Sequence, residues 1–388
     1  MFNFDFYNPT RIIFGKDRLK DIDKYVPHDA IVLITYGGGS AKKSGLLDKV
    51  KTMLGKRKIY EFGGIEPNPR FETLIKAADI VHSKNIDFIL AVGGGSVIDG
   101  TKFISLASYY KGDAMDLLKF GFGRITGEIV KKVVPFGSVL TLPASGSEMN
   151  SGAVISSEHG KFPVRSDLTF PVFSVLDPTL TYTLPEIQVA NGIIDAFVHT
   201  TEQYMTYPVD ARIQDRFAEG ILLTLIEIGK SAVTESDNYD VRANLVWSAT
   251  LALNGLIGTG VPQDWTTHMI GHELTAMFGI DHGQTLAIIY PSLLTVRREQ
   301  KRAKLLQYAE RVWNINQGSE DEKIESAIIK TREFFESLGV KTRLSGFGIK
   351  ADKIPDLVNQ LESHGLTALS ETQDITPEIS RKILENAI

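Results

Sequence analysis

Short apolar runs alternate with helical patterns in the first half of the chain. Ala30–Tyr36 (AIVLITY) and Asp87–Ser96 (DFILAVGGGS) contain apolar runs, as buried strands do, and each run leads into glycines. Phe71–Ile86 and Val97–Tyr110 instead carry apolar residues at helical spacing, and the segment 133–148 (VVPFGSVLTLPASGSE) repeats the scheme of a strand followed by small residues. Strands that alternate with helices predict βαβ units and a parallel sheet.

After about residue 180 the pattern becomes helical. The segment 183–205 opens with Thr183, Pro185 and Glu186, which predicts a capping box with proline in the first turn. The last helix is expected to begin at Thr376–Pro377. Further segments have helical period, namely 210–233, 238–258, 264–279 and 301–315. We therefore predict an α/β domain with a parallel sheet over residues 1–180 and an all-α domain over residues 181–388.

Composition agrees with two globular domains and narrows the partners. The chain has 388 residues, against roughly 100–200 residues for one domain. Its formal net charge is −5, with both signs interspersed, so nothing favours nucleic acid or an anionic membrane as partner. There is no cysteine, which excludes disulfides, thiolate metal sites and cysteine nucleophiles. No signal peptide pattern and no apolar run of about 18 residues occurs, so we expect a cytoplasmic protein.

The segment Val92–Lys102 (VGGGSVIDGTK) is a glycine-rich loop between a predicted strand and a predicted helix. It is not a Walker A loop, because Thr101 separates Gly100 from the lysine, and it is not a dinucleotide fingerprint, because Ile98 stands where the third glycine belongs. Glycines nevertheless let a phosphate approach the backbone, and a helix that starts near Ser96 offers free N–H groups. The alternative is a tight turn with no ligand.

A second loop, YGGGS, follows the first predicted strand. Dinucleotide folds that use NAD often place an acidic residue there, against the ribose hydroxyls. This loop has only glycines and Ser40, with Lys42 and Lys43 just beyond, which suits the extra 2′-phosphate of NADP. A plain turn with solvated lysines is the alternative. The candidate residues of the loop are Gly37, Gly38, Gly39 and Ser40.

One predicted helix carries an ionisable pair on an apolar face. In NGIIDAFVHTTEQYM, Asp195 and His199 lie four residues apart and so project from the same side. His268, from HMIGHE, and His282, from FGIDHGQ, provide two more imidazoles, and one carboxylate with three imidazoles suits Zn²⁺ or Fe²⁺. Any one of these histidines alone would more often be a satisfied core residue. A buried carboxylate, however, costs several kcal/mol unless it is paired or coordinated.

The order of residues in HMIGHE argues against a metallopeptidase. Zinc peptidases carry HExxH, whereas the glutamate here follows the second histidine, His272. The remaining histidines have polar neighbours and are expected at the surface; they are His28, His82, His159 and His364.

Taken together, these motifs resemble those of the iron-containing (group III) alcohol dehydrogenases, in particular the branch of NADPH-dependent aldehyde reductases and butanol dehydrogenases. The resemblance covers essentially the whole chain. It is carried by NPTRIIFG, PNP, AVGGGSVIDGTKFI, TLPASGSE, DPTLTYTLP, GIIDAFVHTTEQY and HMIGHELTAMFGIDHGQTLAI. Each glycine loop alone is a weak signal, but the combination is specific.

The resemblance implies a fold, a reaction and a set of site residues. It implies a dinucleotide-binding α/β domain and a helical metal-binding domain, with the active site in the cleft between them. The reaction would interconvert short- to medium-chain aldehydes and primary alcohols, such as butanal and butanol. Iron or zinc would be held by Asp195, His199, His268 and His282. His272 matches a family position beside the nicotinamide and the substrate. We take His272 and Asp195 as the catalytic residues.

The cofactor positions of the family carry over in the same way. NAD-using relatives tend to have aspartate where this chain has Gly39, which agrees with NADP(H) as cofactor. The family also assembles through N-terminal strands, so we expect a homodimer or a higher homo-oligomer. Besides the YGGGS loop, the matching positions are Asn68, Gly94, Gly95, Ser96, Asp99, Thr141, Leu142, Ser147, Asn150, Lys161, Leu180, Tyr182 and Leu184.

The residues alone leave three other functions possible. A polyol dehydrogenase of the glycerol type would prefer NAD. A metal-dependent hydrolase would use its metal to activate water and would bind no nicotinamide. A non-catalytic metal- or nucleotide-binding protein would bind its ligand without turnover.

Overall fold

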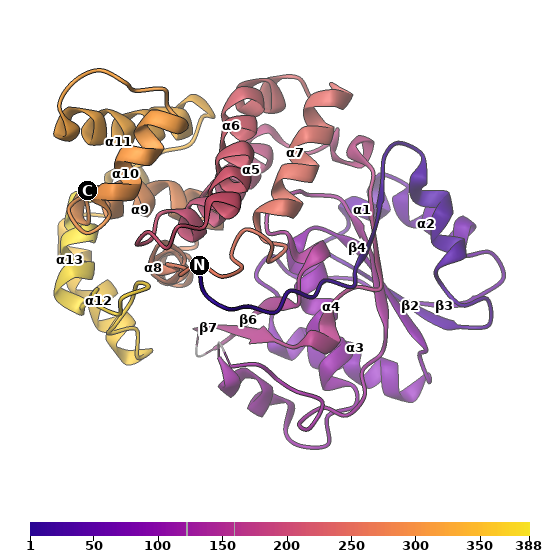
Figure 1. Ribbon diagram of the computed structural model, residues 1–388. Helices are drawn as coiled ribbons and strands as arrows, with labels where there is room; N and C mark the ends of the chain where they lie inside the picture. Colours follow the sequence, from indigo (N-terminus) through magenta and orange to yellow (C-terminus); the bar gives the residue numbers. More distant parts are fainter. Residues whose placement is uncertain (122, 159) are drawn as a thin grey trace. The chain divides into compact units, whose positions relative to one another are not determined.

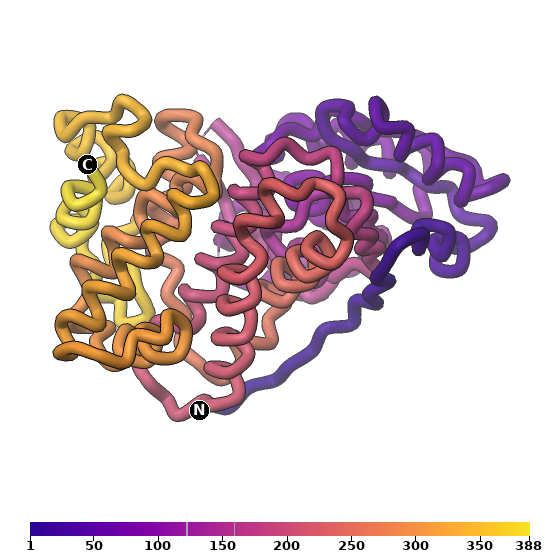
Figure 2. The backbone as a smooth tube through the Cα atoms, turned by 90° about the horizontal axis from the view of Figure 1, so that it is seen from above, coloured from indigo at the N-terminus to yellow at the C-terminus, as the bar shows by residue number. Residues whose placement is uncertain are grey.

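The computed structural model describes residues 1–121, 123–158 and 160–388 of the chain, so His159 lies outside the described residues. The chain folds into two compact units, one formed by Tyr7–Thr183 and the other by Leu184–Ile388 together with Met1–Phe6. The N-terminal segment packs with the helical unit because Phe2 N–H donates to the Gly260 carbonyl (2.9 Å) and the Phe2 ring contacts Tyr207. Figure 2 shows the N-terminus beside that part of the chain. The ranges 1–180 and 181–388 stay a prediction of the domain boundaries.

A six-stranded parallel sheet forms the centre of the first unit (Figure 1). All five strand pairings are parallel, as the alternation of strands and helices predicted. Every residue of the central strand β4 is buried, which explains its unbroken apolar sequence. In spatial order the strands are β1 (Arg11–Phe14), β8 (Phe173–Leu176), β5 (Phe136–Leu140), β4 (Phe88–Gly93), β2 (Ile31–Tyr36) and β3 (Lys58–Phe62).

Helices and a hairpin complete the α/β unit. Leu46 and Val50 of one helix pack with Val32 and Leu90 of the sheet in a single core cluster. The helices are α1 (Ser40–Lys43), α2 (Leu46–Leu54), α3 (Phe71–Ser83) and α4 (Gly95–Ala107). An antiparallel pair, β6 (Gly152–Ser157) with β7 (Gly160–Arg165), was not predicted. Most of its residues are only partly buried, so it lacks the apolar run that marks the other strands.

The second unit is helical, as predicted. Its helices are α5 (Glu186–Tyr204), α6 (Arg212–Thr234), α7 (Tyr239–Ala252), α8 (Thr266–Phe278), α9 (His282–Val296), α10 (Arg302–Arg311), α11 (Glu320–Ser337), α12 (Ile354–Ser363) and α13 (Pro377–Asn386). Short 3-10 helices occur in both units: η1 (Arg18–Lys24), η2 (Ala114–Phe120), η3 (Ser147–Met149), η4 (Asp167–Thr169), η5 (Pro178–Thr181), η6 (Leu344–Phe347) and η7 (Ala351–Lys353).

Helix α5 is the central helix of this unit and packs against α6, α7 and α9. The predicted capping box at its start is wrong. The N-cap residue is Pro185, no side chain caps the helix, and Thr183 lies two residues before the N-cap. The proline ring supplies no N–H and fixes φ, which suits the residue that leads into the helix. The start of α13 is confirmed, since the Thr376 hydroxyl accepts from Ile379 N–H.

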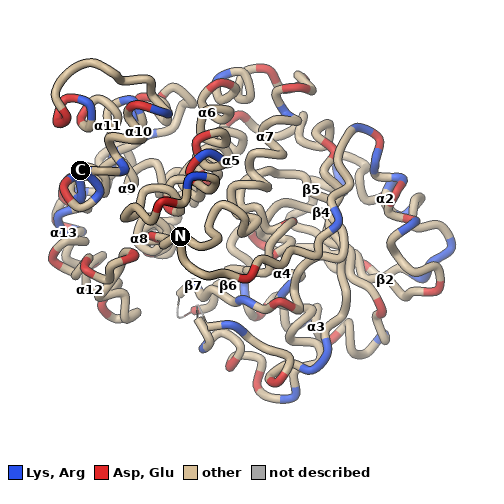
Figure 3. The backbone as a smooth tube through the Cα atoms, in the orientation of Figure 1, with Lys and Arg blue, Asp and Glu red and all other residues tan. Residues whose placement is uncertain are grey.

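Both signs of charge are spread over each unit (Figure 3). Among the described residues, no helix is long and apolar enough to cross a membrane.

Candidate active site

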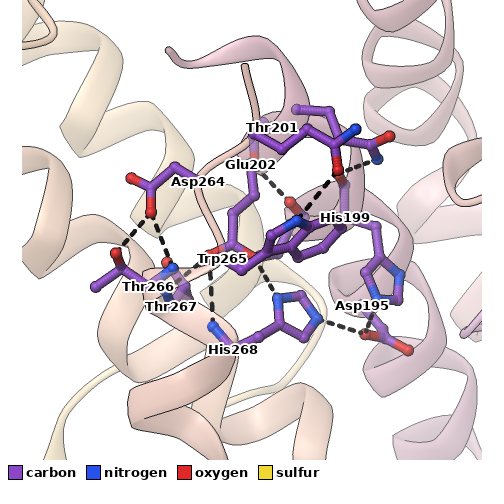
Figure 4. Close-up of polar contacts among 12 residues, drawn as sticks. Asp195, His199, Thr201, Glu202, Asp264, Trp265, Thr266, Thr267 and His268 are labelled. Atoms are coloured by element: carbon purple, nitrogen blue, oxygen red, sulfur yellow. Dashed lines mark hydrogen bonds and ion pairs between the residues drawn. The ribbon is translucent and has the colours of Figure 1, made fainter. Parts of the chain in front are cut away.

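Asp195 and His199 lie one turn apart on α5 and point in the same direction. Both side chains are 6% exposed, so the apolar sequence around them does bury the pair. His268 is the third residue of α8, and His282 is the first residue of α9. Figure 4 shows Asp195, His199 and His268 facing one another. Two helix starts and the middle of a third helix therefore supply the four predicted metal ligands.

The four side chains converge on one point. Asp195 Oδ1 lies 3.5 Å from His199 Nε2, 3.6 Å from His268 Nε2 and 3.5 Å from His282 Nε2. The rings of His199 and His268 stack with their centroids 4.6 Å apart. A tetrahedral ion with bonds of about 2.1 Å separates its ligand atoms by about 3.4 Å. The three separations from Asp195 Oδ1 are close to that value.

Two of the ligand atoms also lack a hydrogen-bond partner among the described residues, which suits atoms that bind a cation. Asp195 Oδ1 and His268 Nε2 are buried and make no hydrogen bond to the described residues, since the 3.6 Å between them is too long. Leaving such atoms unsatisfied costs about 1–3 kcal/mol each, and more for a charged group. Asp195, His268 and His282 place ligand atoms within 4.8 Å of one another. The nitrogen and oxygen donors suit a divalent ion such as Zn²⁺ or Fe²⁺.

The electrostatics of the cluster favour ionised Asp195 and neutral His199. Burial alone would raise the pKa of Asp195, but the neighbouring imidazoles lower it below its usual range. Burial lowers the pKa of His199 to about 4, so this imidazole is neutral at physiological pH, as a ligand must be. Burial alone would lower the pKa of His268 as well. The carboxylates of Glu202 and Asp195 outweigh that effect and raise the pKa of His268 to about 9, so a cation that binds at its Nε2 would displace a proton from it.

His272 lies beside this cluster on α8. Its ring centroid is 5.3 Å from that of His282 and 6.3 Å from that of His268. The three surface histidines that the structure describes, His28, His82 and His364, are exposed as predicted.

Two neighbours of the cluster were missed by the sequence analysis. The Glu202 carboxylate accepts a hydrogen bond from His268 Nδ1, and the Trp265 ring lies 5.5 Å from that of His268 and 6.1 Å from that of His199. Helical spacing was the available signal for Glu202, which follows His199 by three residues on the same face. Trp265 lies just before α8, and no comparable spacing marks it in the sequence.

The predicted nucleotide-binding loops meet at one edge of the sheet. Loops 37–40, 94–96 and 141–147 follow the carboxyl ends of β2, β4 and β5, which are adjacent strands. The chain order reverses between β2 and β4, because β3 lies on one side of β2 and β4 on the other. Ligands of open parallel sheets bind at such a point.

Close packing explains the glycines of the loop 94–96. Gly94 is the N-cap of α4, and a Cβ on Gly95 would lie 2.2 Å from Ser145 Oγ. The backbone N–H of Asn68 lies within 3.4 Å of Ser96 Oγ, so the loop after β3 reaches the same place. In the loop 37–40, Gly39 has φ of +113°, a conformation that favours glycine, and precedes Ser40 at the start of α1.

Predicted cofactor residues around α4 form a polar cluster. Asp99 accepts from Ser147 Oγ (2.6 Å) and from Val154 N–H (2.9 Å). The buried Lys102 ammonium donates to Ser147 Oγ, to Asn150 Oδ1 and to the Gly152 carbonyl at 2.7–2.8 Å. Lys102, which was not predicted as a site residue, organises this edge.

The remaining predicted positions are more dispersed. The Thr141 N–H donates to the Gly93 carbonyl (3.0 Å), and Leu142 lies against Gly94. Lys161 lies on β7. Leu180 packs against the sheet core, and Tyr182 follows η5. Leu184 packs against the core of the helical unit.

Comparison with known families agrees with this geometry. Residues 9–178 match the model of the iron-containing alcohol dehydrogenases, and residues 189–384 match the C-terminal model of the Fe-containing alcohol dehydrogenase family. The chain belongs to the iron-containing alcohol dehydrogenase family, which confirms the resemblance drawn from its motifs. It is accordingly an oxidoreductase of the alcohol dehydrogenase and aldehyde reductase type.

Individual relatives place the chain within that family. It is 59% identical to the NADPH-dependent aldehyde reductase YqhD of Escherichia coli (strain K12), with both chains covered completely. It is 41% identical to the NADH-dependent butanol dehydrogenase A of Clostridium acetobutylicum, over 93% of each chain. The solved structure of the substrate- and cofactor-free form of the E. coli aldehyde reductase YqhD superposes with a TM-score of 0.94 at 57% identity, again over both full chains.

Proposed function

We propose that this protein uses NADPH and one divalent metal ion to reduce short- to medium-chain aldehydes to primary alcohols, and that it also catalyses the reverse oxidation. The observation that supports the proposal most strongly is that the Nε2 atoms of three imidazoles lie within 3.6 Å of Asp195 Oδ1. An oxygen and three nitrogens around one point suit a Lewis-acidic ion.

Each ligand would have a definite task. Asp195, His199, His268 and His282 would hold the ion, which when bound polarises the carbonyl oxygen of the aldehyde and stabilises negative charge on it. Hydride transfer to the carbonyl carbon is the chemistry that the nicotinamide supplies. Asp195 would offset part of the charge of the ion, while neutral His199 donates its lone pair.

His272 is the proposed proton carrier. Its ring lies next to that of His282, 5.3 Å between centroids, and it is only partly buried. A partly exposed imidazole can exchange protons with solvent near neutral pH. It would thus deliver a proton to the alcohol oxygen, directly or through water, and would also shape the wall of the pocket.

The preference for NADPH over NADH is proposed from the loop after β2. Neither Gly38 nor Gly39 would bring a Cβ within 4 Å of another group, so the loop leaves open space for a phosphate. The 59% identical relative is named as NADPH-dependent, and the 41% identical relative as NADH-dependent. Gly39, which stands where NAD-using relatives tend to have aspartate, supports NADPH as the cofactor of this chain.

Metal identity, assembly and location complete the proposal. The nitrogen and oxygen donors accept iron or zinc. Intrinsic affinity favours zinc, and the supply of the two metals would decide which one is bound.

Exposed aromatic side chains at Phe2, Phe4 and Tyr7 support assembly into a homodimer or a higher homo-oligomer. We place the enzyme in the cytoplasm. Light scattering on the purified protein and cell fractionation test the last two points.

The variant Asp195→Asn tests the proposed function. It preserves side-chain size but removes the charge that faces three imidazoles. We expect aldehyde reduction to fall at least about 100-fold, as losses of electrostatic groups commonly do. NADPH binding, followed by nicotinamide fluorescence, should stay within a few-fold of the wild-type value. Normal reduction by the variant would contradict the proposed metal site, and absence of NADPH binding by the wild-type protein would favour a hydrolase.

A further inference from the structure

Glu202 is a buried carboxylate with three hydrogen-bond donors from α8. It lies on α5, and 3% of its surface is exposed. One oxygen, Oε1, accepts from the backbone N–H of Thr267 (2.7 Å) and lies 3.4 Å from the backbone N of His268. The other oxygen, Oε2, faces Nδ1 of His268 (Figure 4).

We propose that Glu202 is a positioning residue of the metal centre, which holds the proton of His268 on Nδ1 and so keeps Nε2 free to bind the ion. This inference rests on the proposed function, because it assigns a task to Glu202 only if His268 is a ligand. The outer nitrogen of a metal-bound histidine commonly donates to a carboxylate, and that partner orients the ring and raises its basicity.

The two oxygens have separate tasks, and an amide cannot perform both. A backbone N–H can only donate, so the atom that faces Thr267 must be an acceptor. In a glutamine at this position, the carbonyl oxygen would therefore face Thr267 and the NH₂ group would face His268. Nδ1 would then have to accept, which moves the imidazole proton to Nε2, the nitrogen that points at Asp195. In that tautomer Nε2 carries the proton and cannot coordinate a metal until the proton is displaced.

The backbone around Glu202 is held in place independently. The Glu202 carbonyl accepts from Asp264 N–H (2.8 Å), and the Asp264 carboxylate accepts from Thr266 N–H (2.9 Å) while it pairs with Lys301 (2.8 Å). Two carboxylates thus face the first turn of α8, where the helix dipole favours negative charge. The frame that carries the Glu202 side chain does not depend on the hydrogen bond to His268.

The test compares Glu202→Gln with a matched control, Glu219→Gln. Glu219 is buried to a similar extent (4% exposed) on α6 of the same unit. It accepts from Tyr204, Arg216, Gln307 and Arg311, none of which is a ligand. Zn²⁺ affinity is measured on the metal-free full-length protein by competition with a chromophoric chelator. We expect Glu202→Gln to weaken Zn²⁺ binding by about 10- to 100-fold, and Glu219→Gln to leave it within about 3-fold of wild type.

The outcomes separate this inference from the proposed function. Equal Zn²⁺ affinity in wild type and Glu202→Gln would overturn the positioning role and leave the metal site intact. Absence of Zn²⁺ binding by the wild-type protein would overturn the proposed metal site itself. Glu202→Asp decides the question if the glutamine variant does not fold. It keeps the charge but is shorter by one methylene, and wild-type affinity in that variant would likewise count against the role.

Discussion

The Nε2 atom of His282, the first residue of α9, lies 3.5 Å from Oδ1 of Asp195 in the middle of α5. The two residues are remote in sequence, and the distance is too long for a good hydrogen bond but suits two ligands of one ion. With His199 and His268 at the same separation, α5, α8 and α9 all meet at the proposed metal position.

Metal binding should therefore stabilise the folded helical unit. The unfolded chain cannot hold all four ligands in this arrangement, so an ion that binds the native state adds stability by mass action. At a free Zn²⁺ concentration 100 times the dissociation constant, the gain is about 2.7 kcal/mol. Differential scanning fluorimetry of the metal-free protein, with and without Zn²⁺, should show a higher melting temperature with the ion. The same addition should not shift the Asp195→Asn variant.

Gly95→Ala should disrupt the nucleotide-binding loop. The added Cβ would lie 2.2 Å from Ser145 Oγ and 3.1 Å from Ser145 Cβ, so the Ser145 hydroxyl must turn away and the loop after β5 or the start of α4 must shift by a few tenths of an ångström. We expect NADPH affinity to fall by at least about 10-fold, which corresponds to about 1.4 kcal/mol. Fluorescence titration with NADPH measures it. Gly220→Ala is the control, since a Cβ there meets nothing within 4 Å, and it should leave the affinity unchanged.

Gly39→Asp should shift cofactor preference toward NADH. The carboxylate would repel a 2′-phosphate and could accept hydrogen bonds from a free ribose hydroxyl. Because φ at this position is +113°, any side chain adds backbone strain of about 1–3 kcal/mol. Gly39→Ala carries the same strain without the charge. The prediction therefore concerns the ratio of kcat/KM for NADPH to that for NADH, which should drop in the aspartate variant and not in the alanine variant.

Lys102→Met should reveal a pH-dependent contribution to stability. Burial lowers the pKa of Lys102 to about 8, against 10.5 for an ordinary lysine. At pH values between these two pKa values, Lys102 is protonated in the unfolded chain and largely neutral in the native state, so the unfolded chain binds more protons. The free energy of unfolding of the wild type therefore rises with pH relative to that of a variant that lacks this group. We expect the variant to be less stable at pH 7.5, because the Gly152 carbonyl loses its donor, and its deficit to widen at pH 9.5. Urea unfolding at the two pH values measures both deficits, and a deficit that narrows as pH rises would contradict the assignment.

The sequence predicted what depends on local periodicity and on spacing along one helix. Parallel strands follow from the apolar runs that end in glycine, and the pairing of Asp195 with His199 follows from their four-residue spacing. The carboxyl ends of β2, β4 and β5 meet as expected because parallel strands share one edge. Family membership followed from the combination of motifs, each of which alone was weak.

The features that were missed depend on tertiary contacts. Lys102 reads as an ordinary helix residue, and only the fold brings Ser147, Asn150 and the Gly152 carbonyl to its ammonium. Glu202 lies among polar residues near the end of α5, where a glutamate normally faces solvent. The capping box failed because its motif ignores the proline, which occupies the N-cap itself.

The most direct test of the account is NADPH oxidation with butanal, measured on the purified enzyme before chelation, after chelation and after Zn²⁺ or Fe²⁺ is added back. We predict that chelation abolishes the reaction and that one of the two ions restores it, while NADPH still binds to the metal-free protein. Full activity after complete removal of the metal, or no reduction of any aldehyde in any metal state, would contradict a metal-dependent aldehyde reductase.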